Sequence, residues 1–88
     1  MDTYRVVNYF DVWYNDEEGY QVNNLCEEGT IELKDYTSTN EIIVKLQQIG
    51  FLNPSVTSRD IDVWNDYEFI ELYVKETGEP IGRLELIH

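Results

Sequence analysis

The chain has few of the residues on which most catalytic and metal chemistry depends. Its 88 residues include one cysteine, one histidine and two prolines. Cys26 alone cannot form an internal disulfide, and one cysteine with one histidine does not make a zinc or iron ligand set. The histidine is His88, so no interior imidazole is available as a general base for a nucleophile. We expect a protein that is not an enzyme, with no catalytic residues, and Cys26 as a small buried side chain.

Hard oxygen ligands are present, but not in the pattern of a metal site. Residues 16–19 and the pair Asp60 and Asp62 supply carboxylates. Neither has the twelve-residue spacing of a calcium loop that ends in a bidentate glutamate. We therefore expect no metal site and no cofactor.

Long hydrophobic runs are also missing. No apolar stretch approaches the roughly 20 residues that a membrane-spanning helix needs. Residues 1–5 lack the basic segment and apolar run of a signal peptide. These absences predict a cytoplasmic protein with no membrane partner.

Positive charge is scarce. The chain has 6 Lys and Arg against 18 Asp and Glu, a formal net charge of −12 and a pI near 4.1. Without clustered basic side chains to replace counterions around phosphates, direct binding to nucleic acid is not expected. The charge favours a basic protein partner, approached by electrostatic steering. The alternative is that the charge serves solubility only.

The composition is nevertheless that of a folded protein. Hydrophobic residues make up 42% of the chain and aromatic residues 14%, more than a disordered acidic chain contains. A chain of this length supports one hydrophobic core, with a stability of about 5 kcal/mol. We expect residues 1–88 to form a single domain.

The first third of the sequence has the pattern of strands. Residues 4–14 are rich in β-branched and aromatic side chains and contain no Gly or Pro. Apolar groups on both faces indicate a strand that is central or covered on both sides. Residues 15–19 form an acidic turn, with Gly19 at a positive φ. The chain returns from Tyr20, and residues 23–24 and 27–29 interrupt it with a bulge or a second turn. Residues 30–34 then alternate as a strand.

A helix is predicted near residues 39–49. Ser38 and Glu41 have the spacing of a capping box. Gly50 suits the left-handed position after the last turn, and Phe51 would pack back toward the helix. The apolar face predicted for this helix consists of Ile42, Ile43, Leu46 and Ile49.

The last third of the sequence predicts three more strands joined by tight turns. Residues 61–63, 69–74 and 81–87 carry alternating apolar side chains. Turn residues separate them at 65–66 and 77–80. The order β-β-(β)-α-β-β-β predicts an α+β fold, an antiparallel sheet of roughly four to six strands with one main helix on one face.

Three groups of acidic residues are candidates for partner binding. In an extended segment, alternate carboxylates lie roughly 6.6–7 Å apart, close to the spacing of successive phosphates. Tryptophan beside charge is typical of interface hot spots. The alternative is that strand exteriors and turns are only solvated, with Trp64 packed in the core or lying across the sheet. The first group is Asp60, Asp62, Trp64, Asp66 and Glu68; the second is Asp11, Trp13, Asp16, Glu17 and Glu18; the third is Glu27 and Glu28.

The two tryptophans lie in similar segments. Residues 10–16 and 61–66 both read apolar, Asp, Val, Trp, and then reach an Asn-Asp pair. Either two strands each run into such a turn, or two equivalent tryptophan-plus-carboxylate sites lie on neighbouring strand ends.

Several segments resemble small uncharacterised acidic proteins of phages and mobile elements of Gram-positive bacteria. They are residues 9–13, 19–24, 29–32 and 82–85. By size and charge the chain is also similar to anti-CRISPR proteins and other inhibitors of host defence, some of which imitate DNA. The resemblance implies an inhibitor in the cytoplasm of a bacterial host cell. It would occupy a basic nucleic-acid-binding surface of a host or defence protein, such as a nucleic-acid enzyme. The alternative is an accessory or regulatory protein of a mobile element. An edge strand could also pair two copies into a homodimer.

Overall fold

The computed structural model describes residues 1–35, 37–66 and 68–88. The chain begins with a long antiparallel hairpin of β1 (Asp2–Asn15) and β2 (Gly19–Leu33). Within its turn, the Asn15 side-chain oxygen accepts from the amides of Glu17 and Glu18 at 2.8 and 3.2 Å. Gly19 has a φ of 82°, which glycine adopts without steric cost. The predicted acidic turn is confirmed.

The interruption predicted in the returning strand is a bulge. Val6 lies opposite Gly29 and Val7 lies opposite Glu27, so Glu28 is the extra residue in the β1–β2 pair. The strand does not end there, because β2 continues from Gly19 to Leu33. The two segments predicted on either side of the interruption therefore belong to one strand.

Helix α1 (Thr39–Gln48) ends as predicted on both sides. The Ser38 hydroxyl accepts from the Glu41 amide at 3.2 Å. Gly50 has a φ of 82°, and the amides of Gly50 and Phe51 donate to the carbonyls of Gln47 and Leu46 at 3.1 and 2.9 Å. These two bonds form a Schellman motif, which satisfies carbonyls of the last turn.

The apolar face of α1 is one residue shorter than predicted. Ile42, Ile43 and Leu46 are buried, but Ile49 is 40% exposed. Ile49 is the C-cap residue, with φ −89° and ψ 2°, where the helical twist has already been lost. The helical spacing that placed its side chain on the core face no longer applies there.

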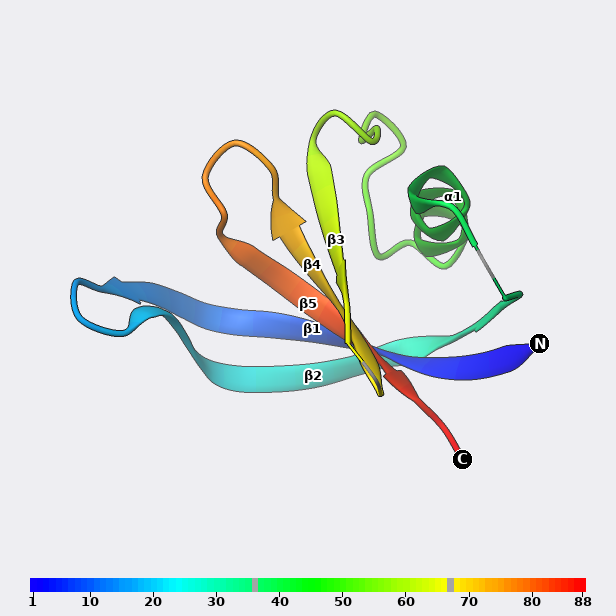
Figure 1. Ribbon diagram of the computed structural model, residues 1–88, viewed down its shortest axis with the longest axis horizontal. Helices are drawn as coiled ribbons and strands as arrows, with labels where there is room; N and C mark the ends of the chain where they lie inside the picture. The colour runs from blue at the N-terminus through cyan, green and yellow to red at the C-terminus, as the bar shows by residue number, and fades with distance from the viewer. Residues whose placement is uncertain (36, 67) are drawn as a thin grey trace.

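Three shorter strands complete the sheet: β3 (Ile61–Asn65), β4 (Phe69–Val74) and β5 (Pro80–Leu86). The order across the sheet is β2-β1-β5-β4-β3, and every neighbouring pair is antiparallel. Strand β5 thus joins the β1–β2 hairpin to the β3–β4 hairpin (Figure 1). The predicted α+β class is confirmed: the described residues form an antiparallel sheet of five strands, within the expected four to six, and one helix.

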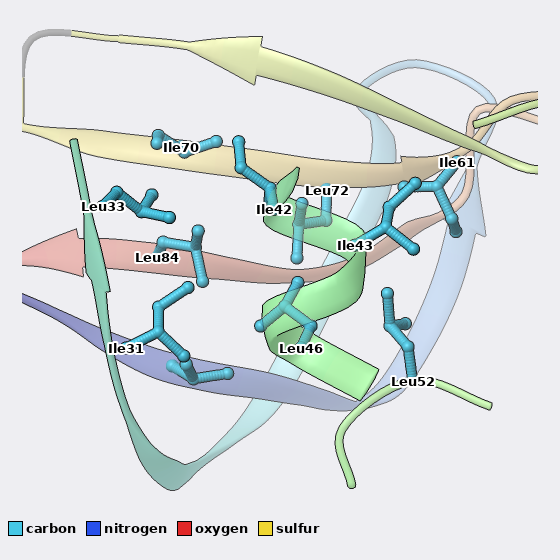
Figure 2. Packing of buried hydrophobic residues seen from close by; sticks show 11 residues of the cluster. Ile31, Leu33, Ile42, Ile43, Leu46, Leu52, Ile61, Ile70, Leu72 and Leu84 are labelled. Carbon is cyan, nitrogen blue, oxygen red and sulfur yellow. The ribbon is translucent and has the colours of Figure 1, made fainter. Parts of the chain in front are cut away.

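One face of the sheet packs against α1 and the segment that follows it. Figure 2 shows Ile42, Ile43 and Leu46 of the helix directed toward side chains of the strands. Leu46, Leu72, Leu84 and Val6 are completely shielded from solvent. The other buried members of this cluster are Ile31, Leu33, Leu52, Ile61 and Ile70.

A close approach between β1, β5 and the end of the helix requires Gly82. A Cβ at this position would clash with the carbonyl oxygen of Val7 and would lie 3.1 Å from the ring of Phe51. Gly82 is buried although it has no side chain. The missing Cβ allows Phe51 to pack against the sheet at this point.

Cys26 does not have the environment that the sequence predicted. It lies in β2 and is exposed, with its thiol 3.7 Å from the Glu27 carbonyl oxygen. All residues from Asn23 to Glu28 are exposed, because β2 is an edge strand and α1 does not cover it there. The prediction of a buried thiol was wrong.

Candidate partner-binding surface

Strand alternation places a second set of side chains on the face of the sheet opposite α1, which we call the open face. It combines aromatic, acidic and basic groups at its centre. Its members from the four adjacent strands are Arg5, Val7 and Tyr9 of β1, Arg83 and Glu85 of β5, Phe69, Glu71 and Tyr73 of β4, and Asp62 and Trp64 of β3.

Register places Glu71 at the centre of a row that crosses the sheet. Trp64 of β3 lies opposite Glu71, and Glu71 lies opposite Arg83 of β5. Directly opposed residues on one face are close enough for their side chains to interact. The carboxylate therefore lies between an indole on one side and a guanidinium group on the other.

A hydrogen bond to Tyr9 orients Glu71. The Tyr9 hydroxyl donates to the carboxylate and lies 2.7 and 2.8 Å from its two oxygens. The Arg83 guanidinium lies 5.8 Å from the centre of the Tyr9 ring, within the range of a cation–π contact. Burial raises the pKa of Tyr9 well above its usual value, and the bond to Glu71 raises it further. Tyr9 is thus held as a neutral donor.

The two cations of the open face are paired with carboxylates. Arg83 Nε lies 2.9 Å from a Glu85 oxygen, and Arg5 lies 3.4 Å from the other Glu85 oxygen. Arg5 also lies 3.3 Å from Glu27 on β2. The positive charges are consequently neutralised locally, whereas Glu71 has a neutral hydroxyl as its hydrogen-bond donor.

A depression of about 490 Å³ lies over this part of the open face. Most of its lining is aromatic, and Glu71 supplies its one ionised side chain. Trp64 is 63% exposed, so the depression is open to a ligand on that side. Its lining consists of Tyr9, Tyr20, Val22, Trp64, Phe69, Glu71, Tyr73, Gly78 and Pro80.

The far part of the β1–β2 hairpin, residues 9–25, extends beyond β5; we call it the outer hairpin. Strand β1 pairs with β5 only from Tyr4 to Asn8, and Figure 1 shows the hairpin continuing past the end of β5. Tyr14 and Tyr20 pack edge to face across it, with ring centres 5.1 Å apart. Its exposed apolar side chains are Phe10, Trp13, Tyr14 and Leu25.

Two of the five residues predicted to form one row lie in β3. Asp62 and Trp64 are on the open face, opposite Tyr73 and Glu71. The extended segment predicted for residues 60–68 is shorter, because β3 ends at Asn65.

The other three members of that row lie outside the strand. Asp60 is in the preceding turn, where its carboxylate accepts from the Thr57 amide at 2.9 Å. Asp66 and Glu68 lie in the connection to β4, and Glu68 is 3.8 Å from His88. A regular row of carboxylates at phosphate-like spacing is therefore absent from β3.

The second and third predicted groups lie on the β1–β2 hairpin. Asp16, Glu17 and Glu18 are exposed at its turn. Asp11 has a φ of 53°, a conformation that aspartate tolerates, and its carboxylate accepts from the Asn24 side chain.

The third group lies at the bulge. Glu28 accepts from the Asn8 side chain at 3.4 Å, and its neighbour Glu27 pairs with Arg5. The structure thus brings the second group to one end of the molecule and the third to the middle of β2.

The two similar tryptophan segments do not form neighbouring sites. Trp13 lies on the outer hairpin in β1, whereas Trp64 lies in β3, and strands β5 and β4 separate β1 from β3. Trp13 is 44% exposed, so both indoles reach solvent in separate surroundings.

Sequence reasoning missed the aromatic and acidic centre of the open face. Phe69, Glu71 and Tyr73 alternate with Ile70 and Leu72, and that alternation is the signal for a second face of β4. Tyr9 could not be joined to Glu71 in this way, because the contact depends on the order of the strands.

Within residues 1–35, 37–66 and 68–88, no cluster of three or more metal-ligating side chains occurs. In the same part of the chain, no helix has the length and apolar character needed to cross a membrane. Comparison with protein-family models, curated proteins and solved structures gave no match for this chain.

Proposed function

We propose that the chain is a non-enzymatic binding protein whose ligand is a basic surface of another protein. One observation carries this proposal: all the acidic side chains except Glu71 and Glu85 are exposed, and large aromatic side chains are exposed among them. With a net charge of −12, such a surface attracts a basic partner over distances longer than contact.

The acidic and aromatic groups would have different roles in the complex. Dispersed exposed carboxylates accelerate association by steering, an effect that salt screens beyond a Debye length of about 8 Å at physiological ionic strength. Aromatic side chains that become desolvated, such as Trp13 and Trp64, would slow dissociation. Charge would therefore set the on-rate, and the aromatic side chains the off-rate.

The partner that we propose is a host or defence protein, bound at its nucleic-acid-binding surface. The net charge supports this choice, as does the resemblance to small acidic proteins of phages and mobile elements. Because β3 holds no regular row of carboxylates, imitation of nucleic acid here would rest on the summed field, not on phosphate-like spacing. An inhibitor of this kind competes with nucleic acid for one site.

The alternative is an accessory protein of a mobile element, in which the charge serves solubility only. Under this alternative, two copies could form a homodimer by pairing their edge strands β2. The unpaired backbone edge of this strand is long, but the charges of Glu27 and Glu28 and the bulge at Glu28 oppose edge-to-edge pairing.

The test begins with proteins retained from a bacterial lysate at low and at high salt. For each retained protein, association and dissociation rates are measured across a salt series, with and without DNA as a competitor. The charge-neutralised variant carries Asp16→Asn, Glu17→Gln and Glu18→Gln at the exposed turn, and a second variant carries Trp64→Ala.

The proposal expects association to slow with salt and in the neutralised variant, and DNA to displace the complex. Trp64→Ala should raise the off-rate. Association that does not depend on salt, or simultaneous binding of DNA and partner at one site, would favour the accessory-protein alternative.

A further inference from the structure

We propose that the depression on the open face is a pocket for the guanidinium group of an arginine side chain presented by a basic protein. This inference rests on the proposed function and specifies the chemistry of its ligand. The depression measures about 490 Å³, enough for one long side chain and part of its backbone. Its aromatic walls and the Glu71 carboxylate together favour a guanidinium group over other side chains.

The walls of the depression are suited to a flat cation. Trp64 and Phe69 come from neighbouring strands, Tyr9 and Tyr20 from the β1–β2 hairpin, and Tyr73 from β4. Aromatic faces attract cations through their quadrupoles, and tryptophan attracts them most strongly. A guanidinium group is planar and stacks on such faces, which an ammonium group does not.

Glu71 supplies the matching anion. Its oxygens accept from Tyr9, but a carboxylate has about four lone-pair positions and can still accept a bidentate guanidinium group. The bond from Tyr9 holds the carboxylate in place, so a ligand would not have to order it. Trp64 lies directly opposite Glu71 in the register, which places an aromatic wall beside the anion.

The basic residue opposite this anion also pairs with another carboxylate. Arg83 is opposite Glu71 in the register, and it forms an ion pair with Glu85 at 2.9 Å. Its guanidinium lies 5.8 Å from the centre of the Tyr9 ring, so this face already holds one cation–π contact. An incoming arginine would make a second cation–π contact on this face, with Trp64.

Charge complementarity favours a basic partner over a second copy of this chain. Each copy carries a net charge of −12, so two copies repel each other. A positively charged segment of another protein would be attracted by the same field.

The probe is the short peptide acetyl-Gly-Arg-Gly-amide, titrated into the full chain. Backbone and indole N–H signals are followed by two-dimensional NMR. Two matched peptides replace arginine by citrulline, which has nearly the same shape without charge, or by lysine. We expect saturable shifts at Trp64 and Glu71 with the arginine peptide, weaker binding of the lysine peptide and no saturation with the citrulline peptide.

Two variants test the pocket itself. Glu71→Gln removes the charge but keeps an acceptor for Tyr9, and should weaken binding by about tenfold or more, since charge-assisted hydrogen bonds are among the strongest. Glu41→Gln makes the same change of net charge on α1, which covers the opposite face, and should leave the affinity within about twofold. Trp64→Ala removes an exposed wall and should also weaken binding.

Equal binding of the citrulline peptide, or equal weakening by Glu71→Gln and Glu41→Gln, would overturn the pocket. So would shifts confined to residues of the outer hairpin that do not line the depression, or peptide-induced self-association detected by light scattering. These outcomes are distinct from failure of the proposed function. A protein partner that still associates in a salt-dependent manner and is displaced by DNA would retain that function without an arginine pocket.

Discussion

Tyr9 of β1 donates a hydrogen bond to Glu71 of β4, although β5 lies between the two strands. The hydroxyl is 2.7 and 2.8 Å from the carboxylate oxygens. A single phenol therefore spans the middle strand and links the two hairpins through side chains on the open face. The same contact orients the one carboxylate of the depression.

Tyr9→Phe should lower the free energy of unfolding by about 1–2 kcal/mol, because Glu71 loses a donor while remaining partly buried. Chemical denaturation at neutral pH measures this loss. Tyr14→Phe is the matched control, since that side chain is 61% exposed and should change stability little. An unchanged free energy for Tyr9→Phe would mean that the contact is not stabilising in solution.

Tyr9 should also make stability fall at high pH. Burial and the bond to Glu71 raise its pKa above the ordinary value of 10.0, so the folded state keeps the proton after the unfolded state has lost it. The stabilisation is therefore complete below pH 10.0 and decreases as the pH rises toward the folded-state pKa. Denaturation measured from neutral to alkaline pH should show a shallower decrease in Tyr9→Phe than in the native chain, and equal slopes would contradict the assignment.

Truncation to alanine should reduce stability much more at a buried position of α1 than at an exposed one. Leu46 is fully buried, so Leu46→Ala should cost about 2–5 kcal/mol, as deletions from filled cores do. Val44 is 49% exposed on the same helix, and Val44→Ala should cost under about 1 kcal/mol. The comparison uses equilibrium denaturation of both variants. Similar losses at the two positions would show that the helix does not pack as described.

Gly82→Ala should destabilise the sheet by about 1–3 kcal/mol, because its Cβ would meet the backbone carbonyl of Val7, which cannot rotate away. Gly50→Ala is the comparison: its Cβ has open space, so its cost of about 1–2 kcal/mol comes from the positive φ alone. NMR should show perturbed amides at the β1–β5 pairing for Gly82→Ala only. If both variants perturbed only amide signals at the end of α1, the close approach of Gly82 to the Val7 carbonyl would be refuted.

The outer hairpin should open more readily than the rest of β1. Tyr4–Asn8 pairs with strands on both sides, whereas the remainder of β1 pairs with β2 alone. A two-stranded ribbon is marginally stable in water. Hydrogen exchange at bonded amides of β1 should therefore be at least about tenfold faster beyond Asn8 than before it. Uniform protection along β1 would indicate that contacts other than its pairing with β2 hold the outer hairpin closed.

Local signals in the sequence were sufficient for the helix and the turns. Ser38 and Gly50 mark both ends of α1 because capping depends on groups only a few residues apart. Ile49 was wrongly predicted to be buried, because the prediction applied helical spacing to a residue that is the C-cap. The bulge at Glu28 was foreseen only as one of two possibilities, since the residues that fix its register lie on β1.

The candidate site was harder to predict, because it depends on strand order. Asp62 and Trp64 were candidates for partner binding, and packing of Trp64 in the core was the alternative; the structure leaves both side chains exposed. Glu71 was not singled out, since its neighbours Trp64, Arg83 and Tyr9 come from three other strands. Cys26 was misjudged for a similar reason: its exposure follows from the edge position of β2, which composition does not reveal.

The central position of β5 has a consequence for how the chain is made. Ribosomes synthesise β5 after the four other strands, yet among the described residues β5 is the strand that pairs with both hairpins. Until it is available, Val6 and Leu72 belong to two separate ribbons, each with an unpaired edge. Pairings between distant parts of a chain form slowly, because loop closure must precede them. The two ribbons thus become one sheet only when β5 is inserted between them.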